Sequence, residues 1–135
     1  DVGDVIRFGV DYDGKIKNII LYYDASEKQF IGKQNLYDNW DEFQNGLVKA
    51  YRLQDGYLTA EADPLCEPDD ENGKKVTIKT NAYRYVEVDM SGRKPSVSRS
   101  SISAVKDWYT YGDDYSYMFM QNRYYEARTL VIYKY

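Results

Sequence analysis

The residues best suited to bind a ligand are tyrosines and aspartates near the end of the chain. Tyrosine is unusually frequent, with sixteen residues against four phenylalanines and two tryptophans. Sugars stack their C–H faces on aromatic rings, and carboxylates accept hydrogen bonds from sugar hydroxyls. One stretch is therefore a candidate carbohydrate-binding surface, and cross-strand pairing of tyrosines within a sheet is the structural alternative. The candidate residues are Tyr109, Tyr111, Asp113, Asp114, Tyr115, Tyr117, Tyr124 and Tyr125.

An acidic segment offers a second kind of chemistry, the binding of a calcium ion. Asp69, Asp70, Glu71 and Asn72 are consecutive, and Ca²⁺ takes oxygen ligands of these types from loops. Residues 11–14 also carry alternating aspartates, but no acid follows at the spacing of an EF-hand, so we interpret that segment as a turn. The sequence predicts Ca²⁺ at residues 69–72 as its one candidate cofactor, with a solvated loop as the alternative.

The composition argues against an enzyme. The chain has no histidine and one cysteine, Cys66, so it contains no Ser-His-Asp triad, no Cys-His pair and no cysteine zinc cluster. It has neither of the glycine-rich phosphate-binding motifs GxxxxGK[ST] and GxGxxG. A glycosidase needs two carboxylates, but twenty-two acidic residues make some such pair inevitable. We therefore expect no catalytic residues.

Charge and hydropathy narrow the classes of partner. The net charge is −4, whereas a nucleic-acid-binding domain needs a basic surface to displace counterions from phosphates. No apolar run approaches the ~18–20 residues of a membrane-spanning helix. The chain starts at Asp1 rather than at a methionine, so we expect a segment of a longer protein. These observations predict that this segment binds no nucleic acid and contains no membrane span.

Three hairpins are expected to position the candidate residues. Residues 6–10 alternate apolar and other side chains, and residues 15–23 return after a turn that contains Asp13-Gly14. Residues 47–53 and 57–62 form a second hairpin around Asp55-Gly56, and residues 116–121 and 127–133 form a third. Residues 76–80 and 83–90 are further strands, and residues 100–108 favour a helical turn.

The first and last hairpins resemble each other in pattern. Residues 19–23 and residues 130–133 are both continuous apolar runs ending in tyrosine. Such a run predicts burial on both faces of a sheet, and thus equivalent places for the two hairpins. The expected fold is all-β, an antiparallel small barrel or sandwich of about eight strands with one or two short helical turns. We expect one domain over residues 1–135, with two lobes joined near residues 63–75 as the alternative.

Three segments of the chain resemble a known family. They read GDVIRFGVDYDGKIKNI, NGLVKAYRLQDGYLTAE and SISAVKDW followed by YMFMQNRYYEARTLVIY. These hairpin patterns are similar to the C-terminal β-rich accessory regions of Firmicute cell-surface proteins that carry S-layer homology domains. The resemblance covers roughly half of the chain, and the sequence NRYYEA stands where that family has a turn glycine. The anchoring repeats of that family are absent from this sequence.

The resemblance implies an extracellular location, on the cell wall or surface of a Gram-positive bacterium. It also implies a non-catalytic structural or adhesive module, whose partners are other domains of the parent protein or a cell-wall polymer. A carbohydrate-binding module that recognises a cell-wall or environmental glycan through its tyrosines is the alternative. The arrangement of the rings separates the two, because coplanar exposed rings favour sugar stacking and rings packed on each other favour a structural role.

Overall fold

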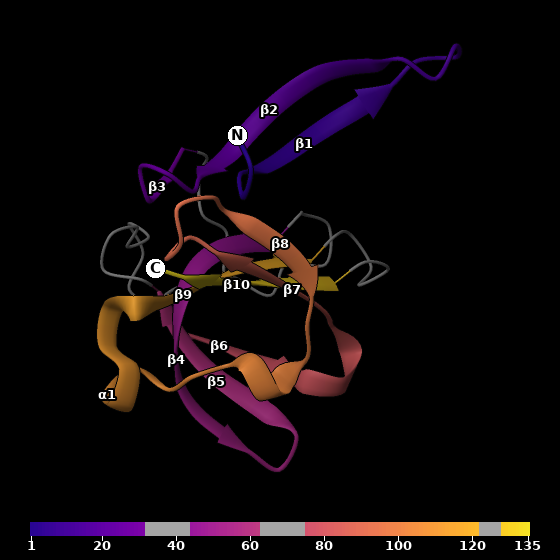
Figure 1. The fold of residues 1–135 in the computed structure, drawn as a ribbon. Coiled ribbons are helices and arrows are strands. Elements are labelled where there is room, and N and C mark those ends of the chain that lie inside the picture. Colours follow the sequence, from indigo (N-terminus) through magenta and orange to yellow (C-terminus); the bar gives the residue numbers. More distant parts are fainter. Residues whose placement is uncertain (32–43, 63–74, 122–127) are drawn as a thin grey trace.

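A computed structural model describes residues 1–31, 44–62, 75–121 and 128–135 (Figure 1). In these ranges the chain forms two β-sheets and a few single helical turns. The strands are β1 (Val5–Val10), β2 (Ile16–Asp24), β3 (Gln29–Phe30), β4 (Gln44–Gln54), β5 (Tyr57–Ala62), β6 (Lys75–Lys79), β7 (Arg84–Asp89), β8 (Ser96–Arg99), β9 (Tyr115–Gln121) and β10 (Arg128–Lys134). The turns are η3 (Thr80–Ala82), η4 (Ile102–Ala104), α1 (Trp108–Tyr111) and η5 (Gly112–Asp114).

The predicted all-β class is confirmed. One sheet has the order β1-β2-β3, and the other has the order β6-β5-β4-β9-β10-β7-β8. The larger sheet is strongly curved (Figure 1). Neighbouring strands within the larger sheet pair antiparallel, except for β7 and β10, which pair parallel. The connection between β8 and β9 includes η4, α1 and η5. The order of the strands in the larger sheet differs from their order in the sequence.

The turn residues explain why the hairpins form where the sequence predicts them. Asp55 and Gly56 have φ values of 54° and 79°, and a two-residue hairpin turn needs positive φ at both central positions. Strands β4 and β5 pair on either side of this turn, from Val48 with Ala62 to Gln54 with Tyr57. Strands β3 and β8 were not expected, because neither has the alternating apolar pattern; β8 is exposed along its whole length.

Buried side chains cover both faces of the larger sheet, in two clusters. One cluster contains Val48, Ala50, Leu58, Ala60, Ile78, Tyr117, Leu130 and Ile132. The other contains Val5, Tyr23, Ala25, Leu47, Val88, Met118, Val131 and Tyr133. Successive side chains of a strand point to opposite faces, and β10 accordingly contributes alternate residues to the two clusters. The apolar run at residues 130–133 is therefore buried on both faces, as predicted.

The first hairpin does not occupy an equivalent place, which corrects the prediction for its apolar run. Ile19 is 63% exposed and Ile20 is 51% exposed, whereas Leu130 and Ile132 are fully buried. The difference in exposure arises from the strands that neighbour each run in the tertiary structure. Strand β10 lies between two long strands in a sheet covered on both faces, while β2 pairs along its length with β1 alone and meets β3 only at its end. The hairpin projects from the rest of the molecule (Figure 1).

Candidate functional site

The projecting hairpin, residues 5–24, is the most unusual surface of the described chain, and we call it the arm. Along β1, alternate side chains share a face, so Ile6, Phe8 and Val10 point the same way. Val10 pairs with Ile16 across the strands, and Ile6 pairs with Leu21. Directly paired residues of an antiparallel ribbon share a face. One face of the arm is thus formed by Ile6, Phe8, Val10, Ile16, Ile19 and Leu21, and we call it the apolar face.

The apolar face is uncovered. Its outer five residues are between 46% and 63% exposed, from Ile6 at the low end to Ile19 at the high end. The opposite face carries Arg7, Gly9, Lys17 and Ile20, since Arg7 pairs with Ile20 and Gly9 with Lys17. Water therefore reaches both faces of a ribbon that is amphipathic by sequence. Soluble proteins seldom leave such contiguous apolar surface open unless it binds a partner.

The tip of the arm is held by its own turn. Asp11 accepts hydrogen bonds on Oδ1 from the backbone N–H groups of Asp13 and Lys15, both at 2.9 Å. The backbone also closes the turn, because Gly14 donates to the Asp11 carbonyl at 3.0 Å with a φ of +77°. The Asp11 carboxylate thus stabilises a hairpin turn, as the sequence predicts for residues 11–14. Tyr12 at the tip is fully exposed.

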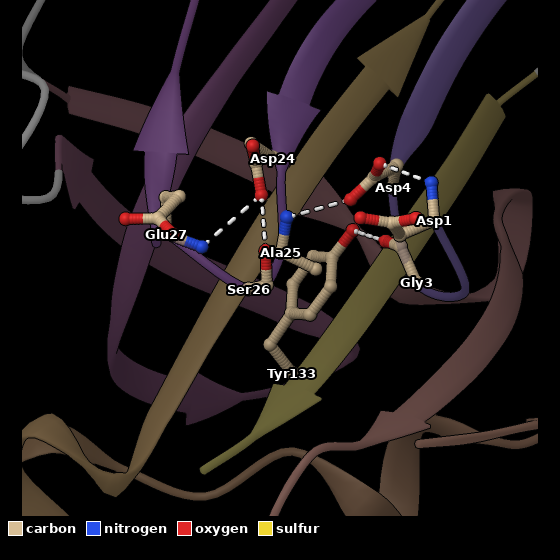
Figure 2. A network of polar contacts seen from close by, with 8 residues as sticks. All are labelled: Asp1, Gly3, Asp4, Asp24, Ala25, Ser26, Glu27 and Tyr133. Carbon is tan, nitrogen blue, oxygen red and sulfur yellow. Dashed lines mark hydrogen bonds and ion pairs between the residues drawn. The ribbon is translucent and has the colours of Figure 1, made fainter. Parts of the chain in front are cut away.

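Polar contacts hold the base of the arm, and one of them reaches the larger sheet (Figure 2). The Tyr133 hydroxyl donates to the Gly3 carbonyl at 2.6 Å, and the backbone N–H of Ala25 donates to Asp4 Oδ1 at 2.9 Å. Asp24 accepts from the backbone N–H of Glu27 and from the Ser26 hydroxyl. These two hydrogen bonds favour the carboxylate and lower the pKa of Asp24.

Close packing fixes the same region. A Cβ atom added at Gly3 would lie 2.9 Å from Val88 Cγ1 and 3.1 Å from Ala25 Cβ. Tyr23 is fully buried, with its ring centroid 4.8 Å from that of Tyr133. Val5 and Tyr23 at the base of the arm, and Ala25 just after it, therefore pack into one core cluster with β10. This packing sets the direction in which the arm projects.

Two residues of the predicted tyrosine surface, Tyr109 and Tyr111, are exposed. Tyr109 is 75% exposed and Tyr111 is 41% exposed. Each packs edge-on against another tyrosine: Tyr109 against Tyr51 at an interplanar angle of 81°, and Tyr111 against Tyr115 at 80°. The two rings of each pair lie almost at right angles, so neither pair forms a flat platform. This geometry favours the structural interpretation of these tyrosines over sugar stacking.

Tyr117 belongs to the core and presents no surface to a ligand. It is 1% exposed, and its hydroxyl donates to the Lys106 carbonyl at 2.8 Å while it accepts from the Lys106 N–H at 2.7 Å. Burial raises the pKa of its phenol. Tyr115 packs against the same cluster, and the Asp114 carbonyl accepts from the Tyr135 N–H at 2.9 Å. The backbone of Asp113 lies in η5, and Tyr124 and Tyr125 lie outside the described residues.

Replacing Tyr117 with phenylalanine is expected to destabilise the fold. The variant leaves the partly buried Lys106 N–H and carbonyl without their hydrogen-bond partner, which costs about 1–3 kcal/mol. Tyr109→Phe is the control, because Tyr109 is largely exposed, and we expect a change within about 0.5 kcal/mol. Urea denaturation of both variants measures the effect. Equal stabilities for the two variants would contradict the role given to the Tyr117 hydroxyl.

The predicted calcium ligands Asp69, Asp70, Glu71 and Asn72 lie outside the described residues, as does Cys66. Within the part of the chain that the structure describes, no three acidic or cysteine side chains are grouped so that they could hold a metal ion. No helix found in that part has the length and apolar character needed to cross a membrane. Calcium at residues 69–72 stays a prediction.

The sequence contains the apolar pattern of the arm, but that pattern predicts a buried hairpin and not an exposed one. Alternation at residues 6–10 and the apolar run at residues 19–23 both indicate burial, and burial against the rest of the chain was expected. The structure leaves Ile6, Phe8, Val10, Ile19 and Ile20 exposed, although it buries Tyr23 at the end of the run.

Comparisons with protein-family models, with curated proteins and with solved structures find no match to this chain.

Proposed function

We propose that this chain is a non-catalytic structural module that joins protein domains in a bacterial cell-surface assembly. One observation carries the proposal: an amphipathic arm, fastened at its base, holds an apolar face away from the rest of the molecule (Figure 1). An isolated two-stranded ribbon is marginally stable in water. Its uncovered face is therefore stabilised by docking against another protein surface. The cell-surface location rests on the resemblance of three hairpin segments.

Docking through the arm would contribute substantial binding free energy. Fully burying one large aliphatic or aromatic side chain contributes about 1.5–3 kcal/mol, and the five outer residues of the apolar face are each about half exposed. The arm needs no catalytic groups for this role, and the absence of histidine from the sequence agrees with it. A firm base suits the same role, because a preorganised arm loses little entropy on binding.

A thermal-shift screen tests this proposal against the carbohydrate-binding alternative. The chain is heated with soluble glycans, purified cell-wall polymers or Ca²⁺. A ligand present at a hundred times its dissociation constant stabilises the native state by about 2.7 kcal/mol, which moves the melting temperature by several degrees. We expect no shift from any glycan. A glycan-dependent shift that disappears in Tyr109→Ala or Tyr111→Ala would overturn the structural role.

Retention at the cell surface tests two parts of the proposal, the cell-surface location and docking through the apolar face. In the source bacterium, an antibody against this chain is expected to label intact cells. Phe8→Lys places a charge on the apolar face and should release the parent protein into the medium. Ile20→Lys is the matched control, because Ile20 is 51% exposed but faces the other side of the ribbon. Absence of surface labelling would contradict the location, and equal retention of the two variants would contradict docking through the apolar face.

A further inference from the structure

We infer that the partner of the arm is a second copy of the same chain, with the two apolar faces packed against each other. The inference rests on the proposed function and names the occupant of its docking surface. The face consists of aliphatic and aromatic side chains from both strands, and no charged side chain interrupts it. A surface of uniform chemistry is complementary to itself, which is what a twofold interface requires, since both subunits contribute the same patch.

The area agrees with this assignment. Five side chains of this size at about half exposure present on the order of 500 Å² of apolar surface, at the upper end of the range for single patches on monomers. Two such faces in contact bury about 1,000 Å², the area at which specific protein–protein interfaces begin. The arm alone therefore suffices for a weak, reversible dimer.

The distribution of charge also favours a dimer formed through the arms. Residues 5–24 contain three basic residues, Arg7, Lys15 and Lys17, and three acidic residues, Asp11, Asp13 and Asp24. The arm is thus neutral, and the net charge of −4 resides in the rest of the chain. Two arms can approach without net repulsion, while the remaining parts of two copies repel each other. Contact through the arms is the arrangement that keeps the acidic parts apart.

Face-to-face packing is favoured over pairing of strand edges. The register of β2 against β1 shifts twice, and Asn18 has a φ of 54° within the second irregularity. Bulges of this kind increase the local twist and interrupt an edge as a template for another strand. Pairing along the edge of β1 would also leave the apolar face exposed to water. Packing of the two faces covers it.

Sedimentation velocity on the full chain, over roughly 1 µM to 1 mM, tests the inference. The wild-type chain is expected to shift from monomer to dimer within this range. Ile19→Lys should weaken the dimer at least tenfold, because it buries an unpaired charge. Ile20→Lys is the matched control, since it introduces the same charge into an adjacent exposed isoleucine on the opposite face. It should leave the dissociation constant within about twofold.

Amide hydrogen exchange provides a second readout that does not depend on a variant. Protection of β1 and β2 amides is expected to rise with protein concentration, and protection in β9 and β10 should stay constant. A wild-type chain that remains monomeric over the whole range would overturn the inference, as would equal effects of Ile19→Lys and Ile20→Lys. The proposed function fails on different results, a glycan-dependent thermal shift or equal retention of Phe8→Lys and Ile20→Lys at the cell surface, so the two failures are distinguishable.

Discussion

Raising the pH above about 10 is expected to unfold this protein steeply, because two core tyrosines must keep their protons in the folded state. Tyr117 and Tyr133 are 1% and 0% exposed, and burial raises the pKa of both phenols. The unfolded chain releases these protons near the ordinary tyrosine pKa of about 10. Their contribution to stability is therefore complete below pH 10 and is lost as the pH rises toward the folded-state pKa values.

The free energy of unfolding is expected to fall with a defined slope as the pH rises. Each tyrosine that ionises only in the unfolded chain lowers the free energy of unfolding by about 1.4 kcal/mol per pH unit, so the two together lower it by about 2.8 kcal/mol per unit. Urea denaturation between about pH 9 and pH 12 measures the slope. Tyr117→Phe is expected to lower the slope by about 1.4 kcal/mol per pH unit, whatever its effect on stability at neutral pH. A slope that is unchanged in this variant would contradict the assignment.

The second large effect is expected for Gly3→Ala, at the base of the arm. Gly3 has a φ of +96°, which costs a residue with a side chain about 1–2 kcal/mol. The new Cβ would also approach within 2.9 Å of Val88 Cγ1, on a stiff, buried side chain. Over-packing of this kind costs about 1–3 kcal/mol. We therefore expect the free energy of unfolding to fall by about 3 kcal/mol in total.

Gly14→Ala is the matched control for this variant. Gly14 also has a positive φ, +77°, but no atom lies within 4 Å of the position of an added Cβ. It should lose only the backbone contribution, about 1–2 kcal/mol. Denaturation curves of both variants, measured under identical conditions, give the difference. If Gly3→Ala were no more destabilising than Gly14→Ala, the packing at the base of the arm would not be as tight as the structure shows.

Local patterns predicted the strands well where the turn chemistry was explicit. Asp55-Gly56 and Asp13-Gly14 locate two hairpins within a residue or two, because Gly14, Asp55 and Gly56 adopt the positive φ that glycine and aspartate tolerate in turns. Local patterns did not predict which of the candidate site residues are buried. Tyr117 and Tyr109 look alike in sequence, yet one is buried and the other is 75% exposed. Tyrosine is amphipathic, so its side chain suits either environment and carries no signal that separates them.

The sequence by itself determined that this protein is built of strands, where its hairpins turn, and that histidine-dependent chemistry is absent from the chain. Only the tertiary structure decided which apolar run becomes core. The runs at residues 19–23 and 130–133 have nearly the same composition, but β10 lies between β9 and β7 with both of its faces covered. Strand β2 stands in a ribbon with open faces. Burial depends on which strands and layers are neighbours, and that is a non-local property of the fold.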